Sequence, residues 1–220
     1  MNSVRLWYKK SGLAIYTSHL DMNRCFTRAV RRADIPLWYT EGFNPHPYMT
    51  FLLPLPLGQT GIREPIDIRT ETDISPEEIK ERLNKVLPQG LEIVDATQAV
   101  NKSNAITHSR YIIEAEFSSE GEAQGFASGV EAVIESGTLN AEKRSKRGAK
   151  LVNLCTYIKD LSVSAKGNCV EINTVLATGT AENLNAGLLF DSLCGEFGAE
   201  PEKYSITRTD IYMQGMEIFK

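Results

Sequence analysis

A chain of 220 residues is long enough for one large domain or two small ones, and its 42% hydrophobic and 24% charged residues are ordinary for a globular protein. No apolar run approaches the ~20 residues of a membrane-spanning helix, so helical membrane proteins are excluded from the expected classes. The net charge of −4 argues against a protein that coats nucleic acid indiscriminately.

The cysteines and histidines show no metal-site spacing. They are Cys25, Cys155, Cys169, Cys194, His19, His46 and His108. No CxxC or HxxxH pair occurs among them, and no Walker-type or GxGxxG loop is present. We therefore expect no metal and no cofactor. The N-terminal residues lack the apolar core of a signal peptide, which together with the scattered thiols favours a reduced, cytoplasmic protein.

The charges are unevenly distributed. Residues 1–50 carry a net +4, residues 51–142 a net −9, and residues 151–220 a net −4. The short stretch 143–150 holds five basic residues and no acid. Two basic patches on an acidic body favour selective binding of an anion.

The first basic patch lies on a predicted helix, His19–Ala33. Ser18 and Asp21 form a capping box at its start. Its apolar face is expected to be Met22, Phe26, Ala29, Val30 and Ala33. Another face carries Arg24, Arg28 and Arg31, with Arg32 alongside. A solvated surface is the ordinary interpretation, but one early acid cannot neutralise four arginines, so we regard this face as a candidate phosphate site.

A proline-rich segment, Glu41–Gly58, follows the helix. Its four prolines exclude a helix and allow only a few residues to pair at a sheet edge. Ordered irregular backbone of this kind often shapes a site, although a structural lid over a sheet is the alternative. We predict that Phe43, Asn44 and Tyr48, together with His46, form a pocket able to stack a base.

The predicted elements of the first half run strand, helix, strand, strand, helix, strand. The strand candidates are Val4–Tyr8, continued by Leu13–Tyr16, then Tyr48–Leu53, Pro65–Thr70 and Leu91–Ala96. The second helix begins at the capping signal Ser75-Pro76-Glu77-Glu78 and carries an apolar stripe of Ile79, Leu83, Val86 and Leu87. This is the split βαβ, or ferredoxin-like, order, with both helices on one face of the sheet.

The second half repeats this order after a polar linker, Thr97–His108. Its elements are expected at Tyr111–Phe117 (strand), Glu120–Ser136 (helix, with Phe126, Val130, Val133 and Ile134 inward), Leu151–Ile158 and Cys169–Thr174 (strands), Ala181–Glu196 (helix) and Tyr204–Tyr212 (strand). The predicted fold class is α+β, with tandem ferredoxin-like domains at 1–98 and 109–220 and antiparallel sheets.

The second basic patch lies in the segment 142–150. Its bases are Lys143, Arg144, Lys146, Arg147 and Lys150. One interpretation is a mobile, solvated turn. The other is a phosphate-binding loop in which Gly148 permits close approach of the backbone.

Candidate catalytic residues are His19, Asp21 and His46. If the proline-rich segment folds over the first helix, two imidazoles and a carboxylate converge, as proton transfer requires. The same three groups make only a weak metal site because their spacing is irregular. Asp21 already serves the capping box, and a helix N-terminus disfavours a charged His19.

Four motifs carry a resemblance to a known family: SHLD (18–21), RAVRRADIP (28–36), GFNPHP (42–47) and PLPLG (54–58). With them the chain resembles the bacterial radical-SAM-linked family, a domain of unknown function. The likeness is dense over residues 4–100 and continues mainly in KRGAK, with Asn153 where relatives more often show an aspartate. Members occur beside or fused to radical SAM proteins with a cobalamin-type domain, so the resemblance implies a partner enzyme rather than a reaction.

These observations lead to three hypotheses. The first is a non-catalytic accessory module that presents structured RNA, a tRNA or rRNA, to a radical SAM enzyme. The second is a metal-independent endoribonuclease that uses His19 and His46, since the tandem order also resembles the architecture of CRISPR repeat-processing endoribonucleases. Their glycine-rich C-terminal loop has no counterpart in this sequence. The third is a protein-docking domain that uses a free sheet face or the PLPLG segment.

Overall fold

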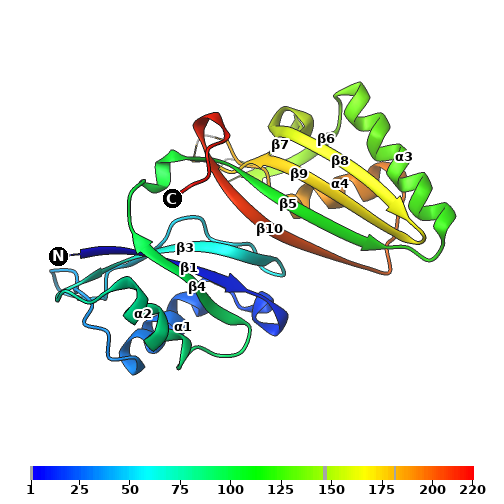
Figure 1. The fold of residues 1–220 in the computed structure, drawn as a ribbon. Coiled ribbons are helices and arrows are strands. Elements are labelled where there is room, and N and C mark those ends of the chain that lie inside the picture. The colour runs from blue at the N-terminus through cyan, green and yellow to red at the C-terminus, as the bar shows by residue number, and fades with distance from the viewer. Residues whose placement is uncertain (1, 146–147, 181) are drawn as a thin grey trace. The chain divides into compact units, whose positions relative to one another are not determined.

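The computed structural model describes residues 2–145, 148–180 and 182–220, and the chain divides into two compact units (Figure 1). Unit 1 comprises the residues up to 103 together with Lys220, and unit 2 comprises residues 104–219. Each unit combines α-helices with an antiparallel sheet. The predicted α+β class is therefore confirmed.

Unit 1 has a four-stranded antiparallel sheet in the order β4-β1-β3-β2. Its elements are β1 (Asn2–Lys10), α1 (His19–Arg32), β2 (Met49–Phe51), β3 (Thr60–Thr70), α2 (Pro76–Asn84) and β4 (Leu91–Gln98). Both helices lie on the same side of the sheet (Figure 1). The side chains of β1 alternate, so that Val4, Leu6 and Tyr8 face the helices and join a core with Phe26 and Ile79.

The two predicted helix starts of unit 1 are confirmed. Ser18 accepts a hydrogen bond from the backbone N–H of Asp21, and Ser75 accepts one from Glu78. Pro76 occupies the first turn of α2, where its missing N–H costs nothing. These caps place the buried faces of α1 and α2 toward the sheet.

One strand prediction in unit 1 is wrong. Leu13–Tyr16 does not continue β1 but lies in a 3₁₀ helix, η1 (Gly12–Tyr16). Gly12 takes a φ of +57°, which turns the chain out of the sheet, and the N–H of Thr17 closes the turn on the carbonyl of Ala14. The segment therefore forms a corner at the end of β1.

In unit 2 the antiparallel strands are in the order β10-β5-β9-β8, and β6 and β7 form a two-stranded hairpin. Its elements are β5 (Ile106–Glu116), α3 (Glu120–Ser136), β6 (Asn140–Ser145), β7 (Gly148–Asn153), β8 (Ile158–Lys166), β9 (Cys169–Ala177), α4 (Ala186–Phe197) and β10 (Lys203–Met213). The core lies between this sheet and the two helices and includes Phe126, Val130 and Phe190. Gly129 of α3 leaves room for the ring of Phe197, which a Cβ there would meet at 2.9 Å.

Several boundaries in unit 2 differ from the sequence-based expectation. The predicted strand Leu151–Ile158 is interrupted, because the Asn153 carboxamide accepts the N–H of Cys155 and turns the chain into a 3₁₀ helix, η3 (Leu154–Tyr157). On the side away from β5, β9 pairs with β8, a strand that the sequence did not predict. Strand β5 begins inside the expected linker, and α4 begins at Ala186 after its Asn185 cap.

One inward assignment on α3 is also wrong. Phe126, Val130 and Val133 are buried as expected, whereas Ile134 is 42% exposed. Ile134 follows Val133 by one residue and is therefore rotated by about 100° around the helix, away from the sheet. Within the described residues, no helix is both long and apolar enough to cross a membrane.

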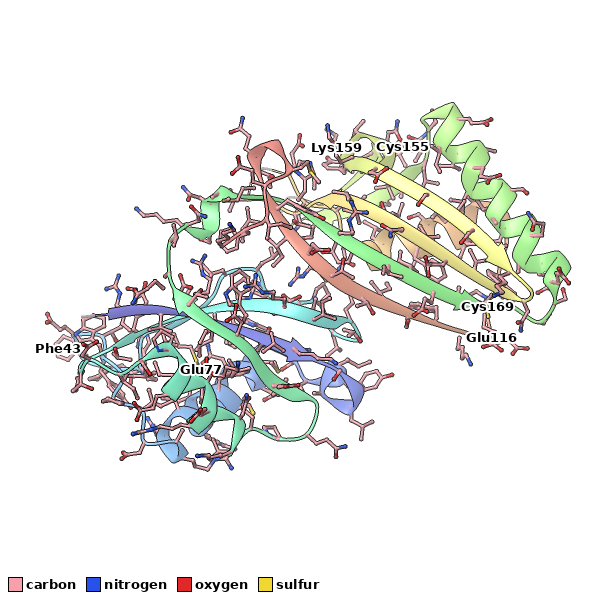
Figure 2. The ribbon with its side chains drawn as sticks, viewed as in Figure 1. Phe43, Glu77, Glu116, Cys155, Lys159 and Cys169 are labelled. Atoms are coloured by element: carbon pink, nitrogen blue, oxygen red, sulfur yellow. The ribbon has the colours of Figure 1, made fainter. Side chains whose placement is uncertain are left out.

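The thiols of unit 2 differ in their surroundings, and this yields a first prediction. Burial, reinforced by the nearby Asp191 carboxylate, raises the pKa of the Cys194 thiol to about 11, whereas Cys169 is exposed (Figure 2). At pH 8 only about 0.1% of Cys194 is then thiolate, the reactive form. We expect a disulfide reagent such as DTNB to modify Cys169 rapidly and Cys194 at least tenfold more slowly. Cys169→Ser should remove the fast phase and Cys194→Ser should leave it intact; the reverse pattern would contradict this assignment.

Candidate nucleic-acid interface

The arginine row lies on the exposed face of α1. Met22, Phe26, Ala29 and Val30 are buried against the sheet, as helical spacing predicts. The opposite face therefore presents Arg24, Arg28, Arg31 and Arg32 to solvent. At 1.5 Å per residue, the backbone positions of Arg24, Arg28 and Arg31 follow one another at about 4–6 Å along the helix axis.

A surface depression of about 580 Å³ runs along these arginines. It is lined by Asp21, Arg24, Cys25, Arg28, Arg31 and Arg32. Arg24 donates a 3.2 Å hydrogen bond to the Asp21 carboxylate, and Arg32 donates a 2.9 Å bond to the carbonyl of Val86. Among the described residues, Arg28 and Arg31 have no ion-pair partner. Two guanidinium groups are thus available for an anion.

Two titratable side chains in the depression respond to their surroundings. A hydrogen bond from Ser18, and then one from Arg24, lowers the pKa of the Asp21 carboxyl below its usual value. Asp21 is therefore ionised near neutral pH and is unsuited to donate a proton. Burial raises the pKa of the half-buried Cys25 thiol, and the positive charges of Arg32 and Arg28 oppose that rise. The depression holds a neutral thiol and a cap carboxylate beside the arginines.

The proline-rich segment does not form one continuous flap. Residues 39–48 make a turn in which Tyr39 forms a bridge with Pro47, Met49–Phe51 is the edge strand β2, and the PLPLG residues follow as a separate loop. The exclusion of a helix and the short edge strand are as predicted. We call residues 39–48 the aromatic turn.

The aromatic turn is held by local hydrogen bonds. The N–H of Thr40 donates to the carbonyl of His46 at 2.9 Å, and the N–H of Tyr48 donates to the carbonyl of Trp38 at 2.9 Å. The His46 imidazole Nδ1 lies 3.1 Å from the Thr40 hydroxyl and 3.2 Å from the carbonyl oxygen of Asn44. His46 therefore has a role in stabilising the turn itself.

The two candidate catalytic histidines lie at opposite ends of β2. The ring of His19 packs edge-on against Phe51, the last residue of β2, with 5.2 Å between centroids. His46 lies three residues before β2 begins, in the aromatic turn. An extended chain rises about 3.3 Å per residue, so roughly 16 Å of backbone separates His46 from Phe51. The structure does not bring the two imidazoles and Asp21 together.

The aromatic turn adjoins a second arginine through its rings. The guanidinium of Arg69, in β3, lies 4.1 Å from the ring centroid of Tyr48 and 5.8 Å from that of Trp38. Those two rings are 5.9 Å apart. Sequence reasoning included Tyr48 but missed Trp38 and Arg69. The arrangement depends on the pairing of Trp38 and Tyr48 with β3, in which the N–H of Trp38 donates to the carbonyl of Arg69.

The second basic patch coincides with the β6–β7 hairpin. Lys150 is exposed on β7. Lys143 and Arg144 belong to β6, but the positions of their side chains are not described, and Lys146 and Arg147 lie outside the described residues. Asn153, at the end of β7, accepts the N–H of Leu139 and donates to the carbonyl of Gly137. Its role is to fix the base of the hairpin.

Comparison with known proteins identifies a family. The model of the family described as "Uncharacterized protein conserved in bacteria (DUF2344)" matches residues 3–186. The chain belongs to this family. The matched range contains α1, the aromatic turn, the PLPLG loop and the β6–β7 hairpin, which are the parts that the sequence analysis singled out.

Two further comparisons add little. No curated protein matches the chain. A solved structure titled "Crystal Structure of an Unknown Protein from Galdieria sulphuraria" is similar over 96% of each chain, with 14% sequence identity and a TM-score of 0.29. A score this low carries no weight for the fold. The family description states no activity, so the evidence for the function of this DUF2344 member comes from the residues of the chain itself.

Proposed function

We propose that this DUF2344 protein is a non-catalytic RNA-binding module and that the arginine row of α1 holds the phosphates. The observation that carries the proposal is the 580 Å³ depression in which Arg28 and Arg31 are exposed and have no carboxylate partner among the described residues. Guanidinium groups bind phosphate oxygens through paired donors. A row spaced a few ångströms apart suits successive phosphates of one strand better than a single small anion.

The fold supports a binding module. We propose that both units are ferredoxin-like, because strand order and direction agree with the split βαβ arrangement in each: β4-β1-β3-β2 in unit 1 and β10-β5-β9-β8 in unit 2. The β6–β7 hairpin is then an insertion between α3 and β8. The four free cysteines suit the reducing cytoplasm, which is the compartment we propose.

The geometry favours binding over catalysis. The endoribonuclease hypothesis requires one imidazole as base and another as acid at the same phosphate. His19 packs on Phe51 and His46 is bonded within the aromatic turn, so the two act at different places. The Asp21 carboxylate accepts a hydrogen bond from the Ser18 hydroxyl at the N-cap of α1.

A radical SAM enzyme is the partner we propose, on the family resemblance. The PLPLG loop offers a contact surface for it, because Leu57 is 63% exposed and the adjacent η1 exposes Leu13 and Tyr16. The loop is joined to η1 by a 2.9 Å hydrogen bond from the N–H of Gly58 to the carbonyl of Ile15. Clustered exposed apolar side chains are typical of protein–protein contacts.

Charge reversal on α1 tests the proposed function. The double variant Arg28→Glu/Arg31→Glu should weaken binding to tRNA or rRNA at least tenfold and reduce the slope of log K against log salt by about 1.4–1.8, since each lost phosphate contact removes about 0.7–0.9. Fluorescence anisotropy at several salt concentrations measures both quantities. Neither side chain belongs to the core, so the fold should be unaffected.

The matched control is Lys102→Glu/Lys166→Glu. It changes the net charge by the same amount at two exposed lysines that lie outside α1. We expect it to keep most of the affinity and the slope. Equal losses in the two double variants would show a general charge effect, and the absence of salt-dependent RNA binding by the unmodified protein would overturn the proposed function.

A further inference from the structure

We propose that Phe43 and Arg69 stack unpaired bases, so that the RNA bound here is a loop or a single strand rather than a regular duplex. This inference rests on the proposed function and specifies the substrate of the same interface. It joins the aromatic turn, which carries Phe43 at its tip, to Arg69 of β3, whose guanidinium lies against the rings of Tyr48 and Trp38. The relevant chemistry is base stacking on aromatic and guanidinium planes.

Phe43 is presented to solvent on a rigid support. Its side chain is fully exposed (112% of the reference area) and extends from the margin of unit 1 (Figure 2). Pro45 and Pro47 restrict the backbone on one side, and Gly42 adopts a φ of +128° on the other. The Thr40–His46 hydrogen bonds close the turn beneath the ring. A fully exposed phenyl ring gains nothing within the folded chain, but on a backbone held by prolines and hydrogen bonds it offers a plane for stacking.

Arg69 provides a second stacking plane. One face of its guanidinium covers Tyr48 at 4.1 Å, and the group has no ion-pair partner among the described residues. Its N–H donors lie in the plane of the guanidinium, so they remain free for a phosphate or a base edge while the faces stack. A nucleobase on the outer face would extend the ring stack that Trp38 and Tyr48 begin.

The phosphate row and the stacking planes come from neighbouring parts of the chain but from different layers of unit 1. Arg31 and Arg32 occupy the last turn of α1, and the chain reaches Trp38 six residues later. Ile66 and Ile68 of β3 pack with α1, so Arg69 lies on the other face of the sheet, and one RNA strand would have to pass around the edge strand β2 to contact both. In a regular A-form duplex the bases are paired and stacked on each other, so they cannot reach these planes.

The test uses the full chain and two RNAs of equal phosphate number. One is a hairpin with 2-aminopurine in its loop, and the other is a blunt duplex. We expect the protein to prefer the hairpin and to quench the 2-aminopurine fluorescence. Phe43→Ala should weaken hairpin binding about five- to 100-fold and abolish the quenching, while the salt slope and the duplex affinity stay unchanged. Arg69→Lys keeps the positive charge but removes the planar guanidinium group, so it should reduce the quenching.

The control is Tyr204→Ala, which removes another exposed aromatic ring (52% exposed), from unit 2. It should leave hairpin binding unchanged. Salt-dependent RNA binding that is equal for hairpin and duplex, or insensitive to Phe43→Ala, would overturn this inference and leave the proposed function intact. Loss of all salt-dependent RNA binding in the unmodified protein would instead overturn the proposed function. If Phe43→Ala impairs only co-purification of a partner protein, the ring is a protein contact and the inference is also overturned.

Discussion

Phe26→Ala should lower the free energy of unfolding of unit 1 by about 3–5 kcal/mol, the usual cost of removing a fully buried phenyl ring. Phe26 has no exposed area and packs edge-on against Tyr8 and Phe51, with centroid distances of 5.3 and 5.7 Å. The ring joins α1 to both β1 and β2. Its loss would leave a cavity that three elements cannot close without moving apart.

The measurement is chemical denaturation followed by tryptophan fluorescence. Both tryptophans of the chain, Trp7 and Trp38, belong to unit 1, so the signal reports the unfolding of this unit. Phe43→Ala is the matched control, because it deletes the same atoms from a fully exposed ring. It should change stability by less than about 0.5 kcal/mol. Similar losses for the two variants would contradict the placement of α1.

Asp67→Asn should be the second strongly destabilising change, by about 3 kcal/mol. Arg5 has no exposed side-chain area, and its guanidinium donates to both Asp67 carboxylate oxygens, at 2.7 and 2.9 Å. Removing the negative charge takes the paired carboxylate away from a buried cation, and breaking a buried pair in this way typically costs about 3–5 kcal/mol. We expect the lower end of that range because 18% of the Asp67 side chain stays exposed.

The comparison for this variant is Asp95→Asn. Asp95 pairs with Arg63 at 2.9 Å, but these side chains are 44% and 37% exposed. A solvent-screened pair contributes at most about 1 kcal/mol. The two substitutions are chemically identical, so the difference between them in the same denaturation experiment measures the effect of burial. Equal effects would show that Arg5 is not held as described.

The elements that the sequence predicted best are those whose signals are local. The caps at Ser18 and Ser75, and the exclusion of a helix from the proline-rich segment, depend on residues within a few positions of each other. Strand β8 was missed because Leu161, Val163 and Ala165 alternate with polar residues and give a weak apolar signal. That strand is defined by its pairing with β9, a contact that composition does not reveal.

The candidate site also has one part that the sequence predicted and one part that it did not. The arginine face of α1 follows from helical periodicity and one capping signal, and the structure places it as the pattern indicates. The convergence of His19 and His46 depended on the proline-rich segment closing over α1, and proline spacing does not predict the strand β2, near whose two ends these residues lie. Strand β2 is defined by its pairing with β3, and it sets the two residues apart.

The sequence alone determined four features, because each depends on residues that are neighbours along the chain. They are the α+β composition, the helix starts, the arginine row and the restricted backbone around Pro45 and Pro47. The tertiary structure alone decided that Arg5 meets Asp67, 62 residues away, and that Arg69 lies on Tyr48. Strand register determines such pairs, and a shift of one residue would turn each side chain to the other face of the sheet. Register is a property of the assembled sheet, which no single segment of the sequence carries.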